Sequence, residues 1–299
     1  MFFTVFANEK LDPHVLPRPL ILEYPEKVEI GLKQGDKEEL QLKCSSWRVA
    51  GEANNLSPWK TIPSECGEYV KNYMMGRAYI VDLEMVSKEA ENYAKSVELS
   101  SDGNDIWVFD VDETLLSNLP YYADHGYGLE VFDSTEFDKW VGKAMAPAIE
   151  SSLKLYDELL GMGFKVFLLT GRSERHRSIT IENLKKAGFR DWDKLILRES
   201  NKPADYLAGL GLGPIDFLSF VGPPIDRQLC MLVEEDANGT IALEDHGKTA
   251  TVYKSEKRTE MAEDGYRIVG NSGDQWSDLL GTSMSDRSFK LPNPMYYIP

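Results

Sequence analysis

Short apolar runs alternate with segments of helical periodicity beyond residue 105. The runs lie at residues 106–109, 164–170, 194–197, 249–253 and 266–270. The segment "APAIESSLKLYDELLGMGF" predicts a helix with Pro147 in its first turn and a stop at Gly161 and Gly163, and residues 174–189 predict another that ends at Gly188. Strands that are almost continuously apolar and separated by helices favour an α/β fold, with a parallel sheet covered by helices on both faces.

The first hundred residues do not follow this alternation. Residues 1–28 are rich in proline and irregular, and "QLKCSSWRV" at 41–49 is a candidate short strand. From 63 to 97 apolar side chains recur at helical spacing without an internal proline. We therefore expect residues 1–100 to form an N-terminal extension with a helical layer, and residues 101–299 to form the main domain.

Two segments interrupt the main domain. Residues 119–146 are rich in aromatic side chains, follow the first run directly and predict a small cap over the strand ends. The cap tyrosines Tyr121, Tyr122 and Tyr127 are candidates for shaping a substrate pocket or for simple core packing. Residues 199–243 are acidic and punctuated by proline and glycine. We interpret them as an insertion looped out from the sheet, with a gene-model artefact or a genuine second cap as alternatives.

Polar residues suited to chemistry follow four of the predicted strands. In an open α/β sheet, ligands bind outside the carboxyl ends of the strands. Asp110 and Asp112 follow the first run, and because residues i and i+2 of an extended segment point the same way, both carboxylates can face one site. The other predicted strand ends carry Thr170-Gly171-Arg172, Lys254 to Arg258, and the pair Asp274 and Asp278.

These motifs, in this order, resemble the four-motif signature of the haloacid dehalogenase (HAD) superfamily of phosphotransferases. The stretches "VFDVDETLLSN", "LLTGRSERHR", "DHGKTATVYKSEKR" and "YRIVGNSGDQWSDLLG" are similar to those of the plant acid phosphatase and vegetative storage protein family, which is class B-like. The resemblance covers about residues 40–198 and 244–299. It implies a Rossmann-like parallel sheet with a small cap and an N-terminal helical extension, and hydrolysis of phosphate monoesters at acidic pH.

The resemblance also implies roles for the acidic residues. Asp110 would attack phosphorus and form an aspartyl-phosphate, while Asp112 would act as general acid and then as general base. We expect crowding by Asp110 and the substrate phosphate to raise the pKa of Asp112, unless the metal offsets this effect. An octahedral Mg²⁺ fits oxygen ligands from Asp110, the Asp112 carbonyl and Asp274, with Asp278 holding that set in place from outside.

The remaining motif residues would bind the phosphate group. Thr170 would donate a hydrogen bond to the phosphoryl oxygens, and Lys254 would neutralise charge on them, with Lys257 as the second candidate for that role. Thr114, Gly171 and Arg172 are further candidates for binding the substrate. Each motif alone would more often be an ordinary turn or a solvated charge run, so the prediction depends on their ordered joint occurrence.

Other phosphatase chemistries do not fit the inventory of residues. No cysteine is followed by an arginine six residues later, and the histidines are scattered, which argues against a cysteine phosphatase and a histidine-rich dinuclear site. His176 is interpreted as a surface helix residue. A calcium loop is excluded at Asp110 because the sixth position lacks glycine and a strand precedes the motif. The alternative function is that of a vegetative storage protein with weak or no phosphatase activity.

The net charge of −16 opposes binding to nucleic acids and anionic membranes. We therefore expect a small phosphorylated substrate and no nucleic-acid partner. No run of about 18 apolar residues predicts a membrane span. The oligomeric state stays open, with a homodimer as one alternative.

The cysteines and the N-terminus bear on the compartment. Cys44 and Cys66 could pair in a secreted protein, with Cys230 left over, or all three could be reduced thiols. The family resemblance implies secretion or the vacuole, although Met1–Ala7 has no positive region before it, unlike a secretory signal. Asn-X-Ser/Thr triplets at Asn55 and Asn238 would accept glycans on such a route.

Overall fold

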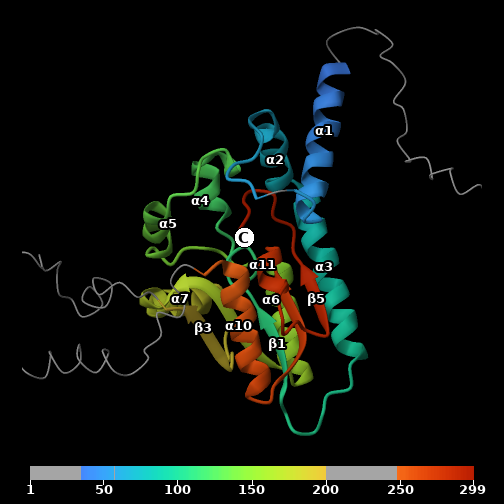
Figure 1. Ribbon diagram of the computed structural model, residues 1–299, viewed down its shortest axis with the longest axis vertical. Helices are drawn as coiled ribbons and strands as arrows, with labels where there is room; N and C mark the ends of the chain where they lie inside the picture. Colours follow the sequence, from blue (N-terminus) through green and yellow to red (C-terminus); the bar gives the residue numbers. More distant parts are fainter. Residues whose placement is uncertain (1–34, 57, 200–247) are drawn as a thin grey trace, which may run out of the picture. The chain divides into compact units, whose positions relative to one another are not determined.

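The computed structural model describes residues 35–56, 58–199 and 248–299 (Figure 1). The chain divides after residue 39: residues 40–299 form one compact unit, and of residues 1–39 the structure describes residues 35–39. The helical layer at 63–97 therefore belongs to the same unit as the sheet, and a domain boundary at residue 100 stays a prediction. The expected insertion at 199–243 lies outside the described residues, apart from Glu199.

A parallel five-stranded sheet forms the centre of residues 40–299. The strands are β1 (Asp105–Phe109), β2 (Lys165–Ser173), β3 (Lys194–Arg198), β4 (Arg267–Gly273) and β5 (Arg287–Lys290). Their order is β3-β2-β1-β4-β5, so the first strand lies in the middle and pairs with both β2 and β4. The predicted α/β fold is confirmed, and the central strand places its carboxyl end between those of its two neighbours.

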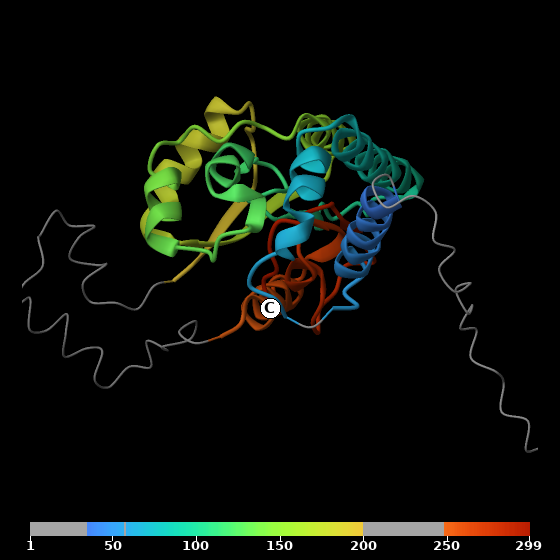
Figure 2. The ribbon, with the colours of Figure 1, turned by 90° about the horizontal axis from the view of Figure 1, so that it is seen from above.

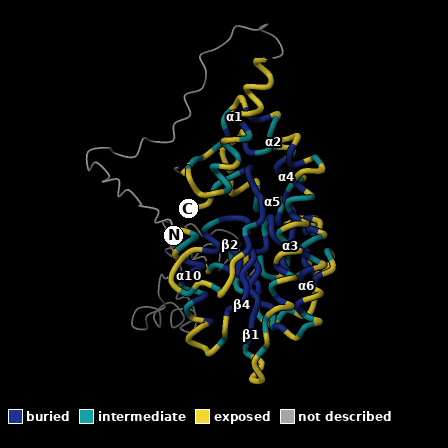
Figure 3. Tube along the Cα trace, turned by 90° about the vertical axis from the view of Figure 1, so that its right-hand side faces the viewer, coloured by how far each residue is buried: buried dark blue, intermediate teal, exposed yellow. Residues whose placement is uncertain are grey.

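Helices cover both faces of this sheet, as expected. The described helices that pack on it are α3 (Arg77–Ser96), α6 (Glu150–Met162), α7 (Arg177–Lys186) and α10 (Ala250–Glu263). Trp107 and Phe109 pack on the side of α3, α6 and α7, whereas Ile106 and Val108 pack with Tyr253 of α10. Figure 3 shows the strands buried between α10 and the pair α3 and α6. Because successive side chains of β1 point to opposite faces of the sheet, one set packs into the core under α3 and α6 and the other into the core under α10.

Two expected strands are corrected. Residues 41–49 lie within helix α1 (Gly35–Glu52), where Cys44 is buried. Residues 249–253 begin α10: Thr249 caps this helix by accepting a hydrogen bond from the Val252 N–H at 3.3 Å. Side chains buried at helical spacing, including Tyr253 and Met261, then outweigh the strand preference of the β-branched residues. The sequence did not predict the short strand β5, because only one of its side chains is buried and a single apolar residue shows no periodicity.

The expected helices are present with shifted ends. Helix α6 begins at Glu150, so Pro147 precedes it rather than lying in its first turn, and Gly163 ends it in the left-handed conformation (φ 97°). The run at 63–97 divides into the short helix η1 (Ser64–Cys66), α2 (Gly67–Met74) and α3, with a break at Gly76. Gly76 has an extended backbone conformation and is the residue that precedes the first turn of α3.

The cap consists of α4 (Leu119–Asp124), the short helix η2 (Gly126–Gly128) and α5 (Ser134–Val141). Tyr121 and Tyr122 are buried in a second core with Met295 and residues of α2 and α3, and Tyr127 packs against it. In Figure 2 the cap is green and α2, beside it, is cyan. These tyrosines are core residues that join the cap to the helical layer.

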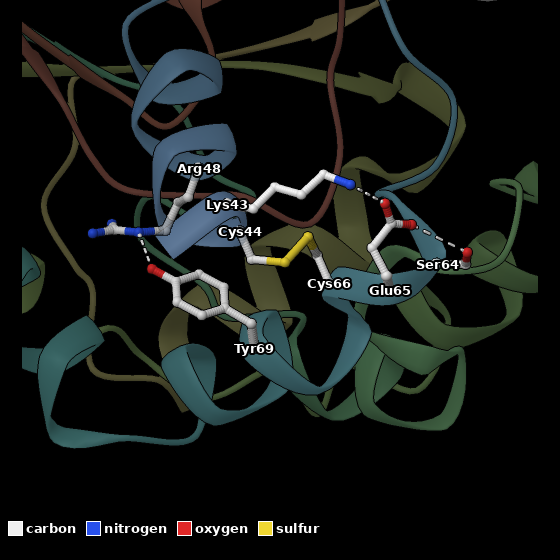
Figure 4. The surroundings of a disulfide bond; sticks show 7 residues. All are labelled: Lys43, Cys44, Arg48, Ser64, Glu65, Cys66 and Tyr69. Carbon is white, nitrogen blue, oxygen red and sulfur yellow. Dashed lines mark hydrogen bonds and ion pairs between the residues drawn. A yellow bond between two sulfur atoms is a disulfide. The ribbon is translucent and has the colours of Figure 1, made fainter. Parts of the chain in front are cut away.

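A disulfide joins Cys44 of α1 to Cys66 of η1 (Figure 4). Beside it, Lys43 forms an ion pair with Glu65 at 2.9 Å. Of the alternatives left open by the sequence, the structure therefore has the paired form, and Cys230 lies outside the described residues. Among the described helices, none is both long and apolar enough to cross a membrane.

Candidate active site

Three carboxylates meet at the carboxyl ends of β1 and β4. The strands are neighbours, and the Asp110 N–H donates a hydrogen bond to the Ser272 carbonyl at 2.9 Å, which brings the following loops together. Asp110, Asp274 and Asp278 each place an oxygen within 4.8 Å of the others, and all three are buried. Sequence reasoning had assigned all three to one metal site, and the structure brings them together.

Lys254 of α10 enters this carboxylate cluster (Asp110, Asp274 and Asp278). Its ammonium group donates to Asp110 Oδ1 at 2.5 Å and to Asp278 Oδ1 at 2.6 Å, with the lysine side chain 6% exposed. Burial lowers the pKa of Lys254, but the two carboxylates raise it further, so the net shift is upward and the lysine stays charged. The ammonium group therefore contacts two of the three carboxylates of the cluster.

The cluster keeps an excess of negative charge. Burial raises the pKa of Asp110 well above its usual range, and the nearby Asp278 and Asp274 add to this against the opposing effect of Lys254. Burial and Asp278 likewise raise the pKa of Asp274 to about 6. An oxygen-only donor set with uncompensated negative charge suits a hard divalent cation such as Mg²⁺. The residues present thus fit the metal that the resemblance implies.

Asp278 is held by close backbone packing. A Cβ atom added to Gly273 would lie 2.4 Å from the Cβ of Asp278, so only glycine permits this approach. The Gln275 N–H donates to Asp278 Oδ2 at 2.8 Å, and this bond forms part of a capping box at the start of α11 (Trp276–Leu279). The spacing of Asp274 and Asp278 is therefore fixed by the turn into a short helix.

Asp112 lies beside the cluster rather than in it. Arg172 donates from Nε to Asp112 Oδ2 at 3.0 Å and from Nη2 to Oδ1 at 2.7 Å, and Asn118 Nδ2 donates to Oδ1 at 2.7 Å. Burial raises the pKa of Asp112, but the arginine and the asparagine outweigh it and lower the pKa overall. Arg172 supplies the opposite charge that lowers this pKa, and the expected rise beside a bound substrate phosphate stays a prediction.

The other motif residues occupy distinct positions. Thr170 is fully buried, and its Oγ1 accepts a hydrogen bond from the Arg172 N–H at 3.1 Å. Thr114 is also buried and donates to Asp274 Oδ1 at 3.4 Å. Gly171 is exposed, with open space where a side chain would begin. Lys257 forms an ion pair with Glu260 at 2.9 Å on α10, whereas Lys254 contacts the carboxylate cluster.

Several residues at the site were not found from the sequence. Glu113 is buried at a positive φ of 53°; its carboxylate accepts from the Asn118 N–H at 2.5 Å and the Tyr296 hydroxyl at 2.6 Å. Burial, with Asp274 and Asp112 nearby, raises its pKa to about 8. Trp140 of the cap donates to Asn118 Oδ1 at 2.8 Å. Glu113 could have been noticed as a further acid within the motif, but the distant partners gave no sequence signal.

Comparison with known proteins agrees with this geometry. The family model described as HAD superfamily, subfamily IIIB (acid phosphatase), matches residues 29–207 and 235–299. The unmatched residues 208–234 lie inside the expected insertion. The chain is 58% identical to acid phosphatase 1 of Solanum lycopersicum over 292 residues, which cover 98% of this chain and 94% of the relative.

Two further comparisons extend this. Vegetative storage protein 2 of Arabidopsis thaliana is 34% identical over 269 residues, covering 88% of this chain and 84% of that protein. Among solved structures, a class C acid phosphatase from Bacillus anthracis superposes with a TM-score of 0.51 at 18% identity, covering 77% of this chain and 84% of that one. The structural match supports the fold, and the closer sequence matches support the family.

Proposed function

The chain belongs to the acid phosphatases of HAD subfamily IIIB, and from this premise we propose that it hydrolyses small phosphate monoesters with Mg²⁺ through an aspartyl-phosphate. The observation that carries the proposal is the cluster of Asp110, Asp274 and Asp278 around the single ammonium group of Lys254. A nucleophile, a cation site and a charge-neutralising lysine then share the carboxyl end of the sheet.

In the proposed first step, a carboxylate oxygen of Asp110 attacks phosphorus, and the bond between phosphorus and the ester oxygen breaks. We expect the negative charge of the bound substrate phosphate to raise the pKa of Asp112, which then gives a proton to the departing alkoxide. In the second step Asp112 removes a proton from water, the water oxygen attacks phosphorus, and inorganic phosphate and free Asp110 are released. The hydrogen bonds from Arg172 and Asn118 hold the Asp112 carboxylate in one orientation for both transfers.

The proposed metal ligands are Asp110, the Asp112 carbonyl and Asp274, with Asp278 beside them. When bound, Mg²⁺ would offset the negative charge of the cluster and polarise a phosphoryl oxygen. Lys254 is fixed between Asp110 and Asp278, and from there it neutralises charge that develops on the phosphoryl group. We assign this role to Lys254 in preference to Lys257, which pairs with Glu260.

Phosphate binding is assigned to the end of β2 and to the loop after β1. The exposed Gly171 leaves its backbone open to a phosphate, because no side chain covers it. Thr170 and Arg172 flank it, and Thr114 faces the metal ligand Asp274. We propose that these residues bind the phosphoryl oxygens, while the rest of the substrate faces the solvent side of Asp112, whose side chain is 20% exposed.

The compartment and assembly are part of the proposal. The disulfide between Cys44 and Cys66 supports an oxidising route, and hence secretion or the vacuole, since disulfides are rare in reducing compartments. A homodimer is retained as the assembly to test by light scattering. A storage role beside catalysis is suggested by the similarity to a vegetative storage protein.

Hydrolysis of an aryl phosphate, with and without Mg²⁺, tests the mechanism. We expect activity to require the metal and to fall by about 10⁴-fold or more in Asp110→Asn, because an uncharged amide cannot take the place of the nucleophilic carboxylate. Asp105→Asn, a buried carboxylate at the opposite end of β1, is the matched control and should keep full activity. Unchanged hydrolysis in Asp110→Asn would sink the mechanism, and absence of activity in the wild type with Mg²⁺ would favour storage.

A further inference from the structure

The segment after β5 contacts both acidic loops of the site. We call residues 291–298 the C-terminal strap. Asn293 Nδ2 donates to Asp274 Oδ2 at 2.7 Å, in the loop after β4. The Tyr296 hydroxyl donates to Glu113 Oε2 at 2.6 Å, in the loop after β1. The strap therefore bridges the two loops that carry the proposed nucleophile and the proposed metal ligands.

Asn293 determines which oxygen of Asp274 remains available. Oδ2 accepts hydrogen bonds from Asn293 and from Gln275 Nε2 at 3.0 Å, so both donors occupy the same oxygen. Oδ1 has a single long contact, with the Thr114 hydroxyl at 3.4 Å. The asparagine amide is itself oriented, because its Oδ1 accepts from the Met295 N–H at 3.0 Å. Asn293 is 4% exposed, so water does not compete for these bonds.

The strap is anchored at the end of helix α1. Glu52 accepts from the Asn293 N–H at 2.9 Å and from Lys290 Nζ at 2.7 Å. The Glu52 carbonyl also accepts from the indole N–H of Trp276, in the short helix between Asp274 and β5, at 2.9 Å. On the cap side, a Cβ added to Gly128 would lie 2.0 Å from the Met295 carbonyl oxygen. Packing from both sides leaves the strap little freedom.

We propose that Asn293 is a positioning residue that holds Asp274 with one oxygen free for the divalent cation, and so sets the affinity of the site for Mg²⁺. The inference rests on the proposed function, because it takes Asp274 as a metal ligand. Removing a group that orients a metal ligand lowers the affinity for the metal by about 10- to 100-fold. Here that group comes from the C-terminal strap and is held by the helical layer through Glu52.

The test measures Mg²⁺ binding to the full chain by isothermal titration calorimetry. Asn293→Ala should weaken binding by about 10- to 100-fold and shift the Mg²⁺ activation constant more than the KM for an aryl phosphate. Asn183→Ala is the matched control: Asn183 is 2% exposed, its Nδ2 donates to the Ala146 carbonyl at 2.7 Å, and it lies outside the site. It should lose stability but keep the wild-type affinity.

Two further variants separate the possible failures. Asp274→Asn removes the ligand itself, and Glu52→Gln loosens the strap without touching Asp274. If Asn293→Ala binds Mg²⁺ as tightly as the wild type while Asp274→Asn does not bind, the strap inference is overturned and the proposed function stands. If Asp274→Asn also binds normally, the proposed metal site is wrong. Should Asn293→Ala fail to fold, Glu52→Gln decides, with weaker binding expected and wild-type affinity contradicting the inference.

Discussion

A buried carboxylate lies at each end of strand β1: Asp105 begins the strand and Asp110 directly follows it. The balance of charge around these two carboxylates differs. At the start of the strand, Asp105 accepts from the Ser100 N–H at 2.6 Å and from Arg267 Nε at 2.7 Å. Burial raises the pKa of Asp105, but these donors outweigh it, and the net shift is downward. Just beyond the end of the strand, Asp110 shares Lys254 with Asp278, and its pKa is raised.

The difference separates a structural carboxylate, Asp105, from the proposed nucleophile, Asp110. Asp105 has enough donors to remain ionised, and its exposed partner Arg267 also pairs with Asp102. The negative charge at the start of the strand is therefore already balanced and needs no additional cation. The cluster around Asp110 holds more negative charge than Lys254 can offset, and such an arrangement is stable only if protons or a cation complete it. An incomplete charge balance at the carboxyl end of a sheet therefore indicates function.

The largest expected effect comes from removing the only cation in the described cluster. Lys254→Met leaves Asp110 and Asp278 without the cation that they share, and breaking such a buried pair costs about 3–5 kcal/mol of unfolding free energy. Activity should fall by about 10²- to 10³-fold with the loss of one charge-stabilising donor. Urea unfolding with and without Mg²⁺ checks this, since the metal should stabilise the variant more than the wild type. Equal stability of both proteins without metal would show that the cluster is not short of positive charge.

A smaller effect is expected from Gly273→Ala. The new Cβ would lie 2.4 Å from the Asp278 Cβ, so the Asp278 side chain or the backbone at residue 273 must shift. Overpacking of this kind costs about 1–3 kcal/mol, and we expect kcat and Mg²⁺ affinity to fall together. Gly161→Ala in α6 is the matched control, because its Cβ meets open space. Steady-state kinetics and calorimetry measure both variants; a fully active Gly273→Ala would mean that the position of Asp278 is not critical.

The smallest effect is expected at the start of β1. Asp105→Asn should destabilise the protein by about 1 kcal/mol, because the pair with Arg267 is partly screened by solvent, and should leave kcat/KM unchanged. Since the folded-state pKa of Asp105 lies below its unfolded value, its contribution is present above about pH 4 and is lost as pH falls through the folded-state pKa. The stability difference between the two proteins should therefore shrink on acidification. A difference that stays constant in urea unfolding down to pH 2.5 contradicts this.

Much of the fold and of the carboxylate cluster could be predicted from the sequence. The runs at 106–109, 164–170, 194–197 and 266–270 are strands because a strand buried on both faces must be apolar throughout. The run at 249–253 has the same β-branched composition but belongs to a helix. Its Thr249 cap is a local hydrogen bond that the sequence could have suggested, whereas the burial of side chains on one helical face depends on tertiary packing.

The positions of Lys254 and Asn293 show why the rest could not be predicted. Lys254 was expected beyond a strand, yet it reaches Asp110 from the side of α10, across 144 residues of sequence. Asn293 contacts Asp274 from a strap whose sequence carries no periodic signal. The pKa of Asp112 depends on Arg172 in the same way. Each of these contacts joins two segments that are far apart in the sequence, and no local sequence pattern shows that they will meet.

The sequence by itself determined the α/β fold, the end of the sheet at which chemistry would occur and the family to which the chain belongs. Periodicity and ordered motifs suffice for these because both are properties of short segments. Only the tertiary structure decided which cation faces Asp110, which way Arg172 shifts the pKa of Asp112 and that Asn293 of the C-terminal strap donates a hydrogen bond to Asp274. The physical reason is that burial and charge pairing are set by neighbours in space, which chain folding brings together from distant positions.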